Sequence, residues 1–118
     1  MVVDSSDRLD SIFHALSDRT RRAMVARLTE REQTVGELAA PFAMSLAGAS
    51  KHVRVLEEAG LIRRTVKGRT HLCSLDREAL SEAEAWIQRT TRFWNERLDA
   101  LERELLAELN DNPHGEGR

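Results

Sequence analysis

The sequence predicts a mainly α-helical domain with a small β-hairpin, and three observations from the middle of the chain predict it. Ser45 is a suitable N-cap for a helix over residues 46–59. Gly60 stands where a residue of left-handed conformation ends such a helix. Two β-rich segments, 61–66 and 70–75, then flank a short turn that contains glycine. A helix followed at once by a basic hairpin is typical of a winged helix-turn-helix.

Two amphipathic helices are predicted before this stretch. Ser6 or Asp7 can cap the first, which runs to about Leu16, and Ser17-Asp18 can cap the second, from Arg19 to about Leu28. Their inward positions follow the helical period and are Leu9, Ile12, Phe13 and Leu16 in the first, and Met24, Val25 and Leu28 in the second.

A short third helix completes the helix-turn-helix pair. After a polar connection at residues 30–33, Thr34 and Glu37 have the spacing of a capping box. Pro41 keeps this helix short, because proline is disfavoured in a helix interior. Leu38 is then available to pack against the helix that Ser45 begins.

The helix over residues 46–59 has two distinct faces. Ala49, Val53 and Leu56 recur at helical spacing and form the inward stripe. The outward face is small and cationic and comprises Ala47, Ser50, Lys51 and Arg54. Residues 46–72 contain six Lys or Arg against two Glu, so their local charge is +4 in a chain with a net charge of −2. This unequal distribution indicates a localised contact with a polyanion.

The longest predicted helix spans residues 81–109, with Ser81 and Glu84 as its capping box. It is about 40 Å long at 1.5 Å per residue, too long for the preceding core to cover. Its apolar seam is therefore expected to meet a second copy of the chain. Large side chains that are enriched at interfaces lie on it, among them Trp86, Phe93 and Trp94.

Length and composition limit the function classes. The 118 residues suit one domain at 7–109, with a flexible N-terminus at 1–6 and a disordered tail at 110–118. The chain shows no signal peptide and no long apolar run, so we expect a cytoplasmic protein without a membrane partner. Cys73 is the only cysteine and is read as a packing residue. No catalytic, metal-ligand or phosphate-loop spacing is present, so we expect neither an enzyme nor a cofactor.

With these elements placed, the chain from about Leu9 to Leu109 resembles the ArsR-type winged-helix repressors. Four segments carry the resemblance: HALSDRTRRAMVARL at 14–28, TVGELA at 34–39, SKHVRVLEEAGLIRR at 50–64 and KGRTHLCSLD at 67–76. The resemblance implies a homodimer joined through its terminal helices that binds an inverted-repeat operator and releases it when an effector or inducing condition arises.

The chain departs from the metal-sensing members of that family. Many of them carry a Cys-x-Cys pair in the third helix, where this sequence has Thr34 and Gly36. Others place His ligands along the terminal helix, and residues 81–109 contain no His. The chain therefore resembles a non-metal member with an unidentified, non-metal signal, for which an unknown small molecule is one candidate.

The predicted function is sequence-specific binding of double-stranded DNA by a homodimeric repressor. The predicted DNA-binding residues are Ser45, Ala47, Ser50, Lys51, Arg54, Arg64, Lys67 and Arg69. The predicted dimer interface consists of Leu9, Phe13, Trp86, Trp94, Leu98, Leu101 and Leu105. The alternative is a winged helix that contacts another protein and does not bind DNA, which would favour exposed apolar residues on the wing over cations.

Overall fold

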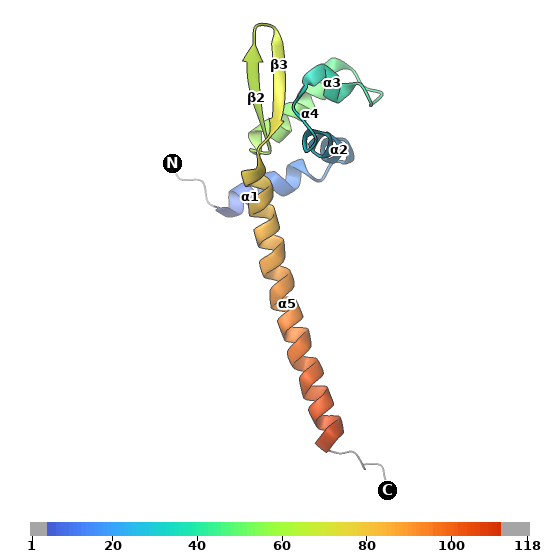
Figure 1. The fold of residues 1–118 in the computed structure, drawn as a ribbon, viewed down its shortest axis with the longest axis vertical. Helices are drawn as coiled ribbons and strands as arrows, with labels where there is room; N and C mark the ends of the chain where they lie inside the picture. The colour runs from blue at the N-terminus through green and yellow to red at the C-terminus, as the bar shows by residue number, and fades with distance from the viewer. Residues whose placement is uncertain (1–4, 112–118) are drawn as a thin grey trace. The chain divides into compact units, whose positions relative to one another are not determined.

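The computed structural model describes residues 5–111 and confirms the predicted winged helix-turn-helix (Figure 1). The elements in order are α1 (Ser5–Ala15), α2 (Arg19–Leu28), β1 (Gln33–Thr34), α3 (Val35–Ala39), α4 (Leu46–Glu58), β2 (Ile62–Lys67), β3 (Thr70–Leu75) and α5 (Arg77–Asp111). Of the predicted flexible ends, residues 1–4 and 112–118 lie outside the described residues. Residues 5 and 6 already belong to α1, and residues 110 and 111 still belong to α5.

The caps predicted for α2, α3 and α4 are confirmed. The side chain of Asp18 accepts a hydrogen bond from the Arg21 amide at 3.0 Å, and Ser45 Oγ accepts one from the Gly48 amide at 3.0 Å. The backbone hydrogen bond of Asp18 lowers the pKa of its carboxyl group. The capping box of α3 is complete, with the Glu37 amide donating to Thr34 Oγ1 and the Thr34 amide donating to Glu37 Oε1. These local bonds fix where each helix begins.

Gly60 ends α4 as the sequence predicts. Its φ of 79° lies in the left-handed region that favours glycine. The Gly60 amide donates to the Glu57 carbonyl and the Leu61 amide donates to the Leu56 carbonyl, the pair of bonds that defines a Schellman motif. This sharp stop sends the chain directly from α4 into the first strand of the wing.

The sheet has three strands, one more than the sequence predicts. Its order is β1-β3-β2, with both neighbouring pairs antiparallel. Lys67 pairs with Thr70, so Gly68 and Arg69 form a two-residue turn in which Gly68 has a φ of 64°. The extra strand, β1, pairs Gln33 with Cys73 and lies in the segment that we predicted to be a polar connection.

The predicted start of α5 at Ser81 is wrong. The helix begins at Arg77, because Asp76 Oδ1 accepts a hydrogen bond from the Glu78 amide at 3.0 Å. Ser81 and Glu84 consequently lie inside the helix. Asp76 follows the last strand of the wing and caps the helix that comes next.

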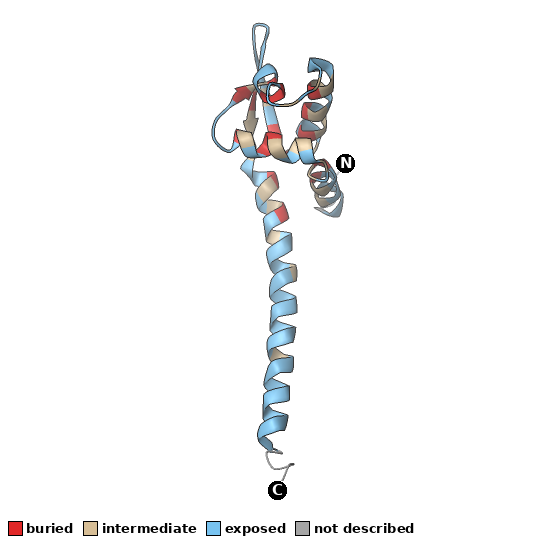
Figure 2. Ribbon diagram, turned by 90° about the vertical axis from the view of Figure 1, so that its right-hand side faces the viewer, coloured by how far each residue is buried: buried red, intermediate tan, exposed pale blue. Residues whose placement is uncertain are grey.

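The chain divides into two compact units, one up to Ala83 and one from Glu84 onward, and α5 contributes to both. The hydrophobic core belongs to the first unit (Figure 2). Its largest fully buried side chains are Ile12, Met24, Leu38, Val53, Leu56, Leu61 and Cys73. None of the helices in residues 5–111 combines the length and hydropathy that a membrane crossing requires.

Candidate nucleic-acid interface

The buried stripe of α4 determines which of its side chains face outward. Ala49, Val53 and Leu56 are fully buried, as the sequence predicts. Ala47, Lys51 and Arg54 are exposed on the other side of the helix, and Ser50 is half-buried at the edge of that face. The N-cap Ser45 is exposed as well. The predicted outward face of α4 therefore lies on the surface, with two cations and otherwise small side chains.

A second contact holds the back of α4 against the beginning of the chain. His52 Nδ1 lies 3.3 Å from Arg21 Nη1 and 4.0 Å from Asp18 Oδ2. Arg21 also donates through Nε to the Ala15 carbonyl at 2.7 Å, which satisfies a free carbonyl at the end of α1. Arg21 therefore bridges α1, α2 and α4.

The wing carries its free cations at the tip. Lys67 and Arg69 are exposed on either side of Gly68, and no carboxylate of residues 5–111 forms an ion pair with them. The same holds for Lys51 and Arg54 on α4. Four of the predicted DNA-binding cations are thus available to an external anion.

The two other arginines of the wing are held by acids. Arg63 Nε donates to Asp76 Oδ2 at 3.1 Å, beside the first turn of α5. Arg64 Nη2 donates to Glu57 Oε1 at 3.0 Å, and its Nη1 lies 3.4 Å from His71 Nδ1. Arg64 was predicted to bind DNA, but the structure shows a half-buried side chain that ties β2 to α4. Its partner Glu57 is the next-to-last residue of α4.

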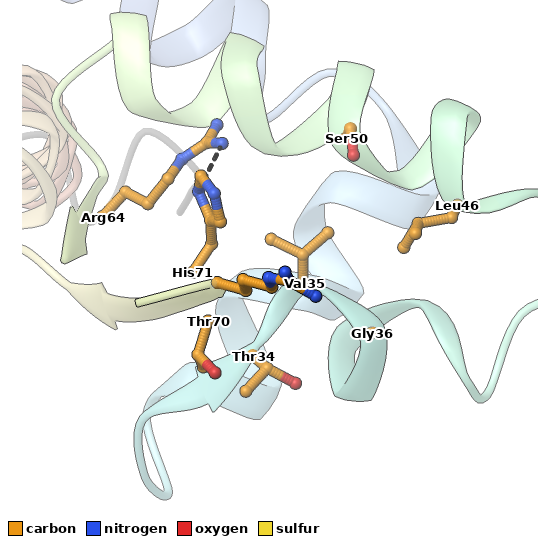
Figure 3. Close-up of a pocket in the computed structure, with 9 residues that line it drawn as sticks. Thr34, Val35, Gly36, Leu46, Ser50, Arg64, Thr70 and His71 are labelled. Carbon is orange, nitrogen blue, oxygen red and sulfur yellow. Dashed lines mark hydrogen bonds between the residues drawn. The ribbon is translucent and has the colours of Figure 1, made fainter. Parts of the chain in front are cut away.

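A groove of about 450 Å³ separates α4 from the wing (Figure 3). Leu46 and Ser50 line it from α4, Thr34 and Val35 from the start of α3, and Thr70 and His71 from β3. Figure 3 shows Leu46 and Ser50 on one side of this groove, with Thr34 and Thr70 across from them. The helix-turn-helix and the wing thus share one recessed surface with a mixed lining of hydroxyl, apolar and basic groups.

The residues predicted to form a dimer interface lie on two helices. Leu9 and Phe13 lie on α1, where they are half-buried, and Phe13 packs against the core. The other five lie on α5 and are large hydrophobic residues that remain exposed: Trp86, Trp94, Leu98, Leu101 and Leu105. Leu106, which the predicted interface does not include, is 52% exposed on the same helix.

Aromatic contacts order one part of α5. The rings of Phe93 and Trp94 meet edge to face with centroids 5.8 Å apart. The guanidinium of Arg97 lies 5.6 Å from the centre of the Phe93 ring. Phe93 and Trp94 are still more than half exposed, so these contacts leave most of their surface uncovered.

The described residues contain no group of three or more His, Cys, Asp or Glu side chains that could hold a metal ion. Cys73 is fully buried on β3, and burial raises the pKa of its thiol. Its expected packing role is confirmed.

The chain is similar to several known proteins. A helix-turn-helix domain model matches residues 16–65, which contain α2, α3 and α4. The HTH-type transcriptional regulator Rv2034 of Mycobacterium tuberculosis is 32% identical over 102 residues, covering 86% of this chain and 92% of the relative. The crystal structure of an ArsR family transcriptional regulator, RHA00566, superposes with a TM-score of 0.72 at 41% identity, covering 75% of this chain and 97% of that one. The chain belongs to the ArsR family of transcriptional regulators.

Membership in the ArsR family makes this protein a transcriptional regulator with a helix-turn-helix DNA-binding domain. A further relative, the transcriptional repressor SdpR of Bacillus subtilis, is 30% identical over 79 residues, covering 67% of this chain and 88% of SdpR. The predicted family is therefore confirmed, and the exposed surface of α4 and the wing is the part of this regulator to test for DNA contact.

Proposed function

We propose that this ArsR-family protein is a cytoplasmic, homodimeric repressor that binds an inverted-repeat operator and leaves it in response to a non-metal signal. The observation that carries the proposal is the set of exposed cations on α4 and at the wing tip that have no ion-pair partner among residues 5–111: Lys51, Arg54, Lys67 and Arg69. Such cations raise the affinity for DNA, because their contacts with phosphates release counterions.

In this proposal α4 enters the major groove and the wing grips the backbone. The major groove of B-DNA accommodates one α-helix, and recognition helices present their N-terminal residues to the base edges. The methyl side chain of Ala47 and the lack of a side chain at Gly48 permit a close approach there. Glu58, exposed at the end of α4, would be repelled by phosphate, which favours entry of the N-terminal half alone.

The second copy of the chain is proposed to cover the apolar side chains of α5. Leu98, Leu101 and Leu105 are each more than half exposed, and these positions repeat at steps of three and four residues. Monomeric proteins rarely expose so continuous an apolar row, because contact with water costs free energy. A two-fold dimer then presents two copies of α4 to two half-sites, which is the reason to expect an inverted repeat.

Repression and the non-metal signal are supported by different facts. The relative SdpR is a transcriptional repressor, and we extend that role to this chain. The sequence supplies one cysteine, Cys73, together with Thr34 and Gly36 where metal sensors of the resembled family carry thiolates. Soft metals and arsenite favour several thiolates, so the ligands expected of a metal sensor are missing.

Contact with a protein through the wing is the competing function. Val66 is 57% exposed on β2 and is the kind of residue that a protein-binding wing presents. It stands directly before Lys67, and the turn that follows adds Arg69, so the tip is cationic overall. This distribution of charge favours DNA.

The test is selection from a pool of random duplexes by the purified protein, followed by sequencing and by affinity measurements on the enriched duplex. We expect an enriched inverted repeat and a loss of affinity of tenfold or more for Arg54→Ala. The matched control is Arg63→Ala, which removes the same charge from a side chain that is paired with Asp76 and should change affinity little. No enrichment above the starting pool, or equal losses for both variants, would refute the proposed DNA-binding surface.

A further inference from the structure

The first residue of α4 is a large hydrophobic side chain that the fold leaves in solvent. Leu46 is 61% exposed directly after the N-cap Ser45. In the described part of the first unit, Val66 on the wing is the other large hydrophobic residue with this exposure. No core contact accounts for a leucine here, and a polar residue would suit an exposed first turn equally well.

A hydroxyl group lies beside this leucine. Ser50 follows Leu46 by four residues, so the two side chains lie on the same side of the helix, one turn apart. Both line the groove between α4 and the wing, as Figure 3 shows. No hydrogen bond is formed by Ser50 Oγ with any described residue, which leaves its donor and acceptor free for an outside group.

The rest of the first turns of α4 lacks groups for hydrogen-bonded base recognition. Ala47, Gly48 and Ala49 follow Leu46, and none carries an amide, carboxylate or guanidinium. Bidentate recognition of guanine or adenine requires such groups. The two cations of this face, Lys51 and Arg54, come one to two turns later on the helix, beyond the first turn that Leu46 begins.

Thymine is the base whose major-groove edge fits an apolar group beside a hydroxyl. It presents a C5-methyl group next to the O4 acceptor, whereas cytosine offers a donor and no methyl group. We propose that Leu46 and Ser50 form a thymine-reading pair, in which Leu46 covers the methyl group and Ser50 donates to O4. This inference rests on the proposed function and adds the base that the first turn of α4 recognises.

The test replaces thymine by uracil, which removes only the methyl group, at each position of the enriched duplex in turn. For the wild-type protein, one position in each half-site should lose about fourfold in affinity, the effect of returning one buried methyl group to water. For Leu46→Ala that loss should disappear, because the contact is already absent. Val66→Ala is the matched control, since it truncates an exposed aliphatic residue on the wing and should keep the full sensitivity to uracil.

A second variant tests the same position of the duplex by introducing a new base contact. Leu46→Gln introduces a side chain that pairs with adenine in the major groove, so renewed selection should exchange thymine for adenine at the same position. Insensitivity of the wild type to uracil at every position would overturn the inference, as would an unchanged loss in Leu46→Ala. Either result leaves the proposed function standing, because that function fails only if the wild type does not enrich a duplex.

Discussion

At the scale of single residues, the partner of each basic side chain shows whether that side chain supports the fold or is available to bind DNA. Arg64 is engaged by Glu57, and Arg21 by the carbonyl groups at the end of α1. Their sequence positions beside other arginines gave no indication of this difference. Lys51 and Arg54, by contrast, were predicted to be outward from helical spacing alone, because the core stripe of α4 fixes the opposite face.

The four available cations are expected to divide between base recognition and backbone contact. Lys51→Ala and Arg54→Ala should weaken binding to the selected duplex more than to a random one. Lys67→Ala and Arg69→Ala should weaken both equally and reduce the slope of log affinity against log salt by about 0.9 for each lost phosphate contact. Salt titrations with fluorescence anisotropy on both duplexes measure this. Equal losses on the two duplexes for all four variants would contradict the division.

Cys73 leads to a prediction about metals. The buried thiol has a raised pKa, which disfavours the thiolate that binds metal. His71, two residues earlier on β3, could add at most one ligand to the same site. We therefore expect micromolar Zn²⁺, Cd²⁺ or arsenite to leave a preformed protein–DNA complex intact, as followed by anisotropy. Release at a stoichiometric amount of any of these would show a metal site between subunits that the single chain does not reveal.

At the scale of elements, local signals were sufficient for most helices and insufficient for β1, whereas the start of α5 was predicted at the wrong local cap, Ser81 in place of Asp76. Caps at Asp18, Thr34 and Ser45 involve residues three apart, so their patterns can be recognised in sequence. Strand β1 exists through its pairing with β3, some forty residues later, and through Gln33, whose side chain exchanges two hydrogen bonds with Arg27. Such long-range pairing has no local signature.

The start of α5 gives a direct comparison between two capping residues. Asp76→Ala should lower the free energy of unfolding by about 1 kcal/mol at pH 7, the usual effect of losing an N-cap. Ser81→Ala, at the wrongly predicted cap, should have no such effect, because Ser81 lies inside the helix. Urea denaturation of both variants measures the difference. A larger loss for Ser81→Ala than for Asp76→Ala would contradict the observed start.

The same cap should depend on pH. The hydrogen bond from the Glu78 amide lowers the pKa of Asp76 in the folded state, and the hydrogen bond from Arg63 lowers it further. The stabilising contribution is therefore present above the ordinary pKa of 3.8 and is lost as the pH falls through the lowered folded value. The difference between wild type and Asp76→Ala should shrink below about pH 4, and a difference that stays constant into this acidic range would exclude the charged cap.

At the scale of the whole molecule, α5 decides whether the regulator acts as one chain or two. The helix has 35 residues and is about 52 Å long at 1.5 Å per residue. Its hydrophobic spacing predicted an apolar seam, and the structure shows those side chains exposed on the single chain. Sequence periodicity identifies such a seam but does not identify what covers it, since a core and a partner helix impose the same pattern.

Acidic substitutions on the seam should disrupt the dimer. The double variant Leu98→Glu, Leu101→Glu would bury two carboxylates against the partner helix, so sedimentation should show monomers and affinity for the full operator should collapse. Gln88→Glu combined with Asn95→Glu is the control, because it adds the same charge to exposed polar positions of α5. A seam variant that remains a folded dimer would place the interface elsewhere.

In the proposed complex two chains, joined through α5, place two copies of α4 on one operator. Sedimentation equilibrium of the wild-type protein on the selected duplex tests this most directly, because it gives the number of chains per duplex. We expect two chains on the intact inverted repeat, and a much weaker complex when one half-site is replaced by random sequence. A complex that contains one chain, with the same affinity for a single half-site as for the full repeat, would rule out the dimeric complex.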